Sequence, residues 1–153
     1  MSFEGLSAEI IKALGSRGIF SPTEPQADAI PCISRGENLL LVAPTGIGKT
    51  EAAMIPIFDA IFRTKGKKGI RCLYITPLRA LNRDMLKRME DVGNELGITV
   101  GVRHGDTSQA ERNKQSQKPP EILITTPETV QVLFTGKRLR EHLKNVEWVV
   151  VDE

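Results

Sequence analysis

Short apolar runs recur along the chain and are separated by longer stretches in which apolar positions lie three or four residues apart. Most of the runs show no strict alternation between apolar and polar positions, which favours strands that are buried on both faces of a parallel sheet. The pattern predicts strands at residues 38–42, 70–75, 98–102, 121–125 and 147–151.

Helical spacing is clearest in the stretch that follows the second of these runs. The apolar positions there, three or four residues apart, are Leu78, Leu81, Met85, Met89, Val92 and Leu96. They predict an amphipathic helix that Gly93 weakens. Other helices are predicted at 50–62 and 127–134, after Ser7, and in a segment that opens at Pro25. Strands that alternate with helices predict an α/β fold, with a mainly parallel sheet sandwiched by helices.

The composition is that of an ordinary folded domain. With 153 residues, 40% of them hydrophobic and 26% charged, the chain is expected to form one domain with a normal core. The longest apolar run, residues 39–43, is far too short to span a bilayer, so no membrane association is expected. Cys32 and Cys72 have no partner at metal-ligand spacing, so we expect buried thiols in a reducing cytoplasm, without a disulfide framework or zinc site.

The 21 basic and 19 acidic residues nearly balance, so binding of nucleic acid would have to come from local geometry rather than from net charge. Neither histidine has a nucleophile as a sequence neighbour. We interpret His104, in a segment that follows a predicted strand, as a residue that shapes a loop. His142 lies in a charged helical segment and is expected at the surface.

Residues 43–50 follow a predicted strand and open a predicted helix with the sequence APTGIGKT. This is the context in which a phosphate-binding loop occurs. Gly46 and Gly48 allow backbone N–H groups to point at a polyphosphate, Lys49 reaches the β- and γ-phosphates, and Thr50 offers a hydroxyl to Mg²⁺. The pattern departs from its strict form at Ala43, where glycine is usual.

A carboxylate that holds Mg²⁺ and activates water is expected at the end of a neighbouring strand. Asp152 and Glu153 follow the last apolar run and supply it. Acidic residues at strand ends are common, and the assignment gains its weight from the phosphate loop earlier in the chain.

Two further strand ends carry the same pair of residues, Thr76-Pro77 and Thr126-Pro127. In each we expect the threonine to cap a helix whose first residue is the proline. Such helix starts lie at the carboxyl edge of a parallel sheet, where several of them suit a string of phosphates. Arg79 falls in the first turn of one, on the same predicted face as Arg83 and Lys87. A single Thr-Pro pair can also start a helix without binding anything.

Together these segments resemble the first RecA-like domain of a superfamily 2 helicase of the DExH or DEAD type. The resemblance extends from about residue 20 to residue 153 and rests on TEPQ, APTGIGKT, TPLRAL, TTPET and VVVDE, which are similar to the Q motif and motifs I, Ia, Ib and II. The segments ITPLRALNRD and RHGDT are similar to those of the Lhr (large helicase-related) group.

The resemblance implies a RecA-like P-loop domain that binds ATP and Mg²⁺ and drives translocation along nucleic acid. Phe20 would pack near adenine and Gln26 would hydrogen-bond its edge. The other ATP-binding positions would be Thr45, Gly46, Ile47, Gly48, Lys49 and Thr50. The catalytic residues would be Lys49, Asp152 and Glu153, with Thr50 and Asp152 as metal ligands.

The implied nucleic-acid contacts are Thr76, Pro77, Arg79, Gly105, Asp106, Thr126 and Pro127. The implied partners are single-stranded DNA or RNA, or a DNA/RNA duplex being unwound, together with a second RecA-like domain of the same protein.

In the family, motif III and the second RecA-like domain with its arginine finger follow the segment that ends here at Glu153. Residues 1–153 are therefore expected to be an incomplete first RecA-like domain, with an N-terminal helix and Q-motif region in 1–35. We expect it to bind nucleotide, to hydrolyse it poorly and to expose an apolar sheet edge. Two alternatives remain open at this point, an unrelated small P-loop NTPase or kinase and a non-catalytic nucleic-acid-binding remnant.

Overall fold

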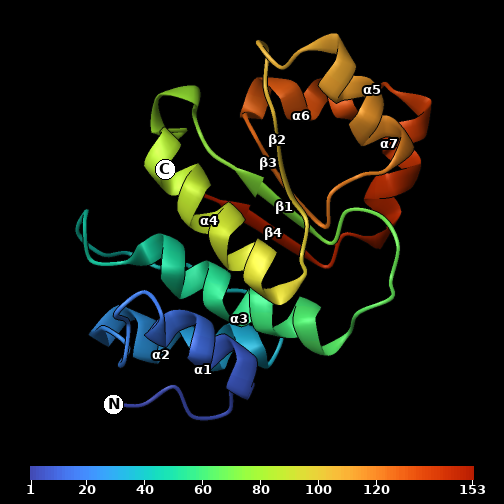
Figure 1. Cartoon of the computed structure of the whole chain (residues 1–153). Coiled ribbons are helices and arrows are strands. Elements are labelled where there is room, and N and C mark those ends of the chain that lie inside the picture. The colour runs from blue at the N-terminus through green and yellow to red at the C-terminus, as the bar shows by residue number, and fades with distance from the viewer. The chain divides into compact units, whose positions relative to one another are not determined.

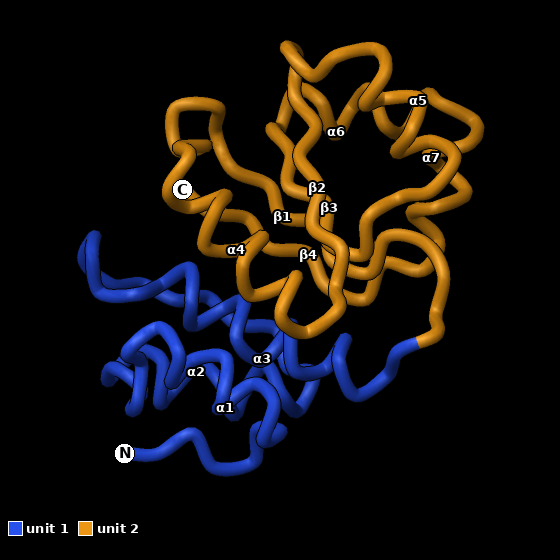
Figure 2. The backbone as a smooth tube through the Cα atoms, viewed as in Figure 1, with its two compact units in different colours: residues 1–65 blue, residues 66–153 orange.

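The computed structural model describes all 153 residues, which form two compact units, residues 1–65 and residues 66–153 (Figure 2). The first unit contains only helices and the connecting segments, and the second contains the whole sheet. No helix in either unit is long and apolar enough to cross a lipid bilayer.

Three helices make up the first unit, α1 (Ala8–Gly15), α2 (Glu24–Ser34) and α3 (Lys49–Arg63) (Figure 1). Both α1 and α2 contact α3, whose buried positions include Ile57 and Ile61. Asp59 of α3 is also buried, and it accepts hydrogen bonds from the backbone N–H of Ser7 at 3.0 Å and from Arg63 Nε at 2.8 Å. Ser7 thereby fixes the start of α1 against α3.

The strand predicted at residues 38–42 does not form. These residues have no regular secondary structure, and the side chains of Leu40 and Val42 are 87% and 85% exposed. A strand is stabilised by backbone hydrogen bonds to a neighbouring strand, and no strand pairs with this segment. The apolar run alone was therefore not sufficient, and the prediction is wrong for this structure.

The second unit is built on a four-stranded parallel sheet with strand order β2-β3-β1-β4. The strands are β1 (Cys72–Ile75), β2 (Val100–Arg103), β3 (Ile122–Thr125) and β4 (Trp148–Val151). The other four strand predictions are thus confirmed, each within two residues of its bounds. The two central strands are buried on both faces, as their uninterrupted apolar runs indicated.

Helices flank this sheet, which confirms the predicted α/β class (Figure 1). They are α4 (Arg83–Leu96), α5 (Gln109–Gln117), α6 (Pro127–Leu133) and α7 (Lys137–His142), with 3-10 turns η1 (Leu78–Ala80) and η2 (Leu143–Asn145). Leu133 of α6 and Leu139 of α7 pack on Leu73 and Leu123 of the sheet, while α4 contacts β2. Cys72 is fully buried, and burial raises the pKa of its thiol to about 12, whereas Cys32 is half-buried.

The helix predicted to start at Thr76 and Pro77 begins later, at Arg83. Asn82 caps α4 by accepting a hydrogen bond from the backbone N–H of Met85 at 2.8 Å, and only the short turn η1 lies before it. A capping residue further along the chain therefore determines the helix start. The expectation that Arg79 shares a helix face with Arg83 and Lys87 is wrong for the same reason.

Strand β4 forms one edge of the sheet. Val149 and Val151 are 58% and 73% exposed, so an edge strand with apolar side chains lies open. In the family the open edge is expected at the phosphate-loop strand, which does not form here, so the edge is found at β4 instead.

Gly93 provides a test of the packing of α4. A Cβ at this position would lie 2.5 Å from the carbonyl oxygen of Ile98 and 2.9 Å from Val100 Cγ2. Alanine usually stabilises a helix relative to glycine, by about 1 kcal/mol. Here we expect Gly93→Ala to lower the free energy of unfolding by about 1–3 kcal/mol, because the backbone carbonyl of Ile98 has to move.

Gly15, the last residue of α1, is the matched control, since a Cβ there would lie no closer than 3.7 Å to another side chain. Urea unfolding of the parent, Gly93→Ala and Gly15→Ala measures both effects. Equal stability of the two variants, or stabilisation by Gly93→Ala, would contradict the close approach of α4 and Ile98.

Candidate nucleotide loop and sheet edge

The loop at residues 43–48 leads directly into α3, as the sequence indicated. Gly46 and Gly48 have φ values of 79° and 85°, in the left-handed region where residues with a Cβ are strained. A Cβ at Gly46 would meet no other atom within 4 Å, so space is open beside the loop. Backbone N–H groups at the start of α3 and the helix dipole both favour an anion at this position.

Lys49 is the first residue of α3 and lies half-buried beside the loop. Its Nζ donates a hydrogen bond to the carbonyl oxygen of Ala43 at 2.8 Å. The ammonium group is thus held at the first residue of the loop, beside which it would bind phosphate. An ammonium group has three N–H donors, so two remain for charged phosphate oxygens, which form stronger hydrogen bonds than a carbonyl does.

The loop is braced from α2. Gln26 is buried, its Nε2 donates to the carbonyl oxygen of Gly48 at 3.2 Å, and its Oε1 accepts from the backbone N–H of Thr23 at 3.1 Å. The hydroxyl of Thr23 donates to the carbonyl oxygen of Ile47 at 3.2 Å. Sequence analysis missed these contacts, although Thr23 and Gln26 have the spacing of a capping box. Phe20 lies 79% exposed before α2, with its ring free to stack on a ligand.

In the second unit, the carboxyl ends of all four strands lie at one edge of the sheet. The backbone N–H of Thr76 donates to the carbonyl oxygen of Thr125 at 3.0 Å, and that of Asp152 donates to the carbonyl oxygen of Ile75 at 2.9 Å. The hydroxyl of Thr125 donates to the carbonyl oxygen of Arg103 at 2.7 Å. The residues that follow the strands are therefore neighbours, as predicted from the parallel order.

The helix start predicted at Thr126 and Pro127 is confirmed, whereas the one predicted at Thr76 is not. Thr126 Oγ1 accepts a hydrogen bond from the backbone N–H of Thr129 at 3.4 Å, and Pro127 is the first residue of α6. Thr76 lies at the edge but caps no helix, and its buried Oγ1 has no hydrogen-bond partner.

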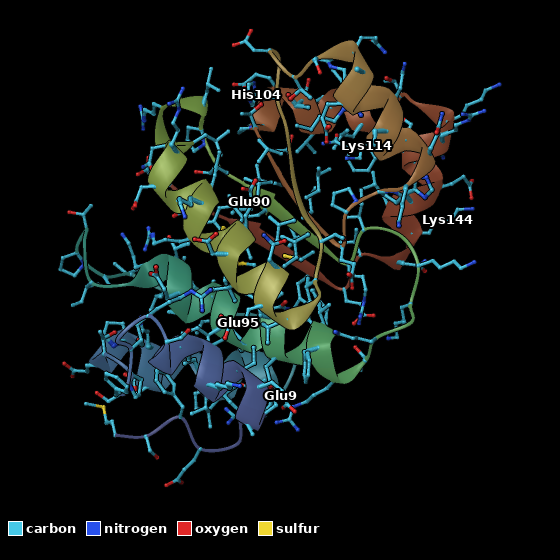
Figure 3. All side chains as sticks on the ribbon, in the orientation of Figure 1. Glu9, Glu90, Glu95, His104, Lys114 and Lys144 are labelled. Carbon is cyan, nitrogen blue, oxygen red and sulfur yellow. The ribbon has the colours of Figure 1, made fainter.

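The turn between β2 and α5 has His104 at its start (Figure 3). His104 Nδ1 accepts a hydrogen bond from the backbone N–H of Asp106 at 3.1 Å, and the backbone N–H of His104 donates to Thr107 Oγ1 at 2.9 Å. The interpretation of His104 as a loop-shaping residue is confirmed, and Gly105 and Asp106 lie exposed at the tip of the turn. His142 is half-buried rather than at the surface, because its Nε2 lies 2.9 Å from the carbonyl oxygen of Ser116.

At the end of β4, Asp152 Oδ2 accepts a hydrogen bond from the hydroxyl of Tyr74 at 2.5 Å. Tyr74 is fully buried in β1, so it fixes the orientation of this carboxylate. Glu153 Oε2 lies 3.7 Å from Arg79 Nε, an exposed ion pair that contributes little to stability.

The structure contains no group of three or more His, Cys, Asp or Glu side chains placed to hold a metal ion. Mg²⁺ does not need such a group, because proteins bind it through one or two carboxylates together with substrate phosphates and water. Taken separately, Thr50 offers a hydroxyl at the start of α3 and Asp152 a carboxylate at the end of β4, and both are oxygen ligands of a type that Mg²⁺ accepts.

A sequence model of the DEAD/DEAH box helicase family matches residues 23–153. The chain is 43% identical over 147 residues to the ATP-dependent helicase Lhr-Core of Sulfolobus acidocaldarius, a match that covers 88% of this chain and 17% of that protein. It is 39% identical over 157 residues to the Lhr helicase/uracil glycosylase of Escherichia coli, covering 90% of this chain and 10% of that protein. The chain therefore spans less than a fifth of the length of these relatives.

Among solved structures, the Mycobacterium smegmatis helicase Lhr bound to ssDNA and AMP-PNP is similar, with a TM-score of 0.83 and 37% sequence identity. The match covers 98% of this chain and 20% of that one. The RecA-like fold and the similarity to Lhr helicases that the motifs indicated are both confirmed.

The brace formed by Gln26 gives a prediction for the loop. Replacing Gln26 with leucine keeps its approximate volume but removes both amide hydrogen bonds, each worth about 0.5–1.5 kcal/mol. We expect amide hydrogen exchange in residues 43–48 to become roughly tenfold faster or more.

The matched control is Gln131→Leu, at an exposed position of α6. Hydrogen-exchange mass spectrometry of the three proteins measures the effect. Parental exchange rates in Gln26→Leu would mean that Gln26 does not hold the loop.

Proposed function

The chain belongs to the DEAD/DEAH box helicase family, and on that basis we propose that it is the nucleotide-binding part of an ATP-dependent helicase or translocase. The observation that carries this proposal is the loop at 43–48, with left-handed backbone at Gly46 and Gly48 directly before α3. The arrangement favours a triphosphate, because the backbone N–H groups and the ammonium of Lys49 supply positive charge on one side of it.

Each site residue then has a proposed role. Lys49 would direct its remaining N–H donors to the β- and γ-phosphates and neutralise their charge, and Thr50 would offer its hydroxyl to the metal ion. A bound Mg²⁺ would neutralise phosphate charge and orient the leaving group. Asp152, held by the hydroxyl of Tyr74, would offer its other carboxylate oxygen to that ion, and Glu153 would orient the attacking water.

The base of the nucleotide would meet Phe20 and Gln26. The exposed ring of Phe20 offers a stacking surface for adenine. The side-chain amide of Gln26 accepts from Thr23 and donates to Gly48, and its second N–H and second oxygen lone pair would remain for the edge of adenine. The remaining ATP-binding positions, Thr45 and Ile47, contribute backbone groups of the loop.

The sheet edge of the second unit is the proposed contact with nucleic acid. The Lhr helicase of Mycobacterium smegmatis, which this chain resembles, was solved with single-stranded DNA. We propose that this chain binds single-stranded DNA or RNA, or a duplex being unwound, through its phosphates. The residues proposed to contact these phosphates are Thr76, Pro77, Arg79, Gly105, Asp106, Thr126 and Pro127. Such binding is insensitive to base sequence and weakens with salt.

Hydrolysis by these 153 residues alone is proposed to be slow. An arginine contributed from a second domain stabilises the transition state of phosphoryl transfer and is worth about 10³- to 10⁵-fold in rate. The proposed partner is therefore a second RecA-like domain of the same protein.

Replacement of Lys49 with alanine tests nucleotide binding. The variant loses a charged hydrogen-bond donor to the phosphates, worth about 1.5–3 kcal/mol, so we expect affinity for Mg²⁺–AMP-PNP to fall roughly tenfold to a hundredfold. Isothermal titration calorimetry of the parent and variant measures this directly.

Lys12→Ala, at an exposed position of α1, is the matched control and should bind as the parent does. Equal affinities of Lys49→Ala and the parent would refute the proposed phosphate loop.

A further inference from the structure

Arg112 of α5 forms hydrogen bonds to the backbone of the turn between β2 and α5. Its Nε donates to the carbonyl oxygen of Thr107 at 2.9 Å, and its Nη2 donates to the carbonyl oxygens of His104 at 3.1 Å and Gly105 at 2.9 Å. One guanidinium thus binds three carbonyls of a four-residue turn. The carbonyl of Arg112 in turn accepts a hydrogen bond from the hydroxyl of Ser116 at 2.9 Å, which anchors this part of α5.

This arrangement affects what the turn presents to solvent. Carbonyl oxygens repel a phosphate, and Arg112 directs three of them toward itself. The space beside Gly105 is open, since a Cβ there would meet nothing within 4 Å. A ligand can therefore approach the backbone of the turn closely at this position.

The charge of Arg112 is not neutralised within the protein. No carboxylate lies within ion-pair distance of Arg112 or of Arg103, which lies at the end of β2. The nearest acids along the chain, Asp106 and Glu111, pair with neither arginine. Arg103 is only 9% exposed, and its Nη1 donates to the carbonyl oxygen of Arg112 at a long 3.5 Å. Burial, and then the charge of Arg112, lower the pKa of Arg103.

Two guanidinium groups without a counter-ion are unfavourable unless an anion from outside the chain compensates them. Arg112 also keeps its Nη1 amino group without an acceptor in the protein. This group is a donor suited to a phosphate oxygen. The two arginines lie at the carboxyl edge of the sheet, beside the exposed Gly105 and Asp106. Nucleic-acid phosphate is the ligand proposed for that edge, so a phosphate is the anion that we expect to compensate their charge.

We propose that Arg112, supported by Arg103, shapes the turn at residues 104–107 and supplies the positive charge by which it binds a phosphate of single-stranded nucleic acid. This inference rests on the proposed function and adds two residues to the proposed contacts. Arg112 acts as a positioning residue through its three carbonyl bonds, and as a ligand contact through its free amino group.

The test uses the 153-residue chain and a fluorescently labelled oligothymidylate. Anisotropy gives its affinity for the parent, Arg112→Gln and Arg112→Lys at several salt concentrations. Arg138→Gln, at an exposed position of α7, is the matched control for loss of a surface charge. Thermal unfolding and Mg²⁺–AMP-PNP binding serve as folding controls for every variant.

We expect Arg112→Gln to bind roughly tenfold more weakly at low salt, with a salt slope reduced by about one. Arg112→Lys retains the charge but cannot hold three carbonyls in a fixed fork, so we expect a parental salt slope with several-fold lower affinity. The Arg138→Gln variant should change affinity less than twofold. A merely structural role of Arg112 would not alter the salt slope.

A parental salt slope in Arg112→Gln would overturn the phosphate contact, and parental affinity in Arg112→Lys would overturn the positioning role. If the parent binds the oligonucleotide and Arg112→Gln binds equally well, this inference alone fails. If the parent does not bind even at low salt, the proposed function of the sheet edge fails, and the inference fails with it.

Discussion

The parallel register of the four strands is the constraint on which the second unit depends. Backbone bonds from Thr76 to Thr125 and from Asp152 to Ile75 align the carboxyl ends of three strands, and Thr125 binds the carbonyl of Arg103 on the fourth. The residues that follow the strands become neighbours because of this alignment, whatever their side chains. A slip of one residue in a central strand would exchange the side chains on its two faces and separate these groups.

The sequence predicted the sheet well because its central strands are buried on both faces and therefore read as uninterrupted apolar runs. It failed at residues 38–42, where the run is apolar but no neighbouring strand supplies hydrogen bonds. Strand pairing depends on two segments, so the sequence of one segment alone does not predict it. Helix α5 was missed because it is polar along its length, with Gln115 as its one buried residue. The helix start at Asn82 was missed because Thr76-Pro77 matched the same capping rule earlier in the chain.

Part of the candidate site, like part of the fold, could be predicted from the sequence. The loop at residues 43–48 could be proposed as a phosphate site from the sequence because the motif consists of consecutive residues, and Gly46 and Gly48 have the left-handed backbone that the motif requires. The contacts that hold the sites in place could not be predicted from the sequence. Tyr74 and Asp152 lie 78 residues apart in the chain, and Gln26 and Gly48 lie 22 apart, so only the fold brings each pair together. The three carbonyl bonds of Arg112 depend on the shape of a turn that no local pattern specifies.

We propose that the chain binds two ligands, a nucleotide through the loop at residues 43–48 together with Asp152 and Glu153, and nucleic-acid phosphates at the sheet edge of the second unit. Chemical-shift mapping of the ¹⁵N-labelled chain tests this most directly. Mg²⁺–AMP-PNP should perturb the amides of residues 45–50 and of Gln26, whereas an oligothymidylate should perturb residues 76–79, 104–107 and 126–129. The claim would be contradicted if both ligands perturbed the same amides, or if the oligonucleotide perturbed only the basic segment at 137–144.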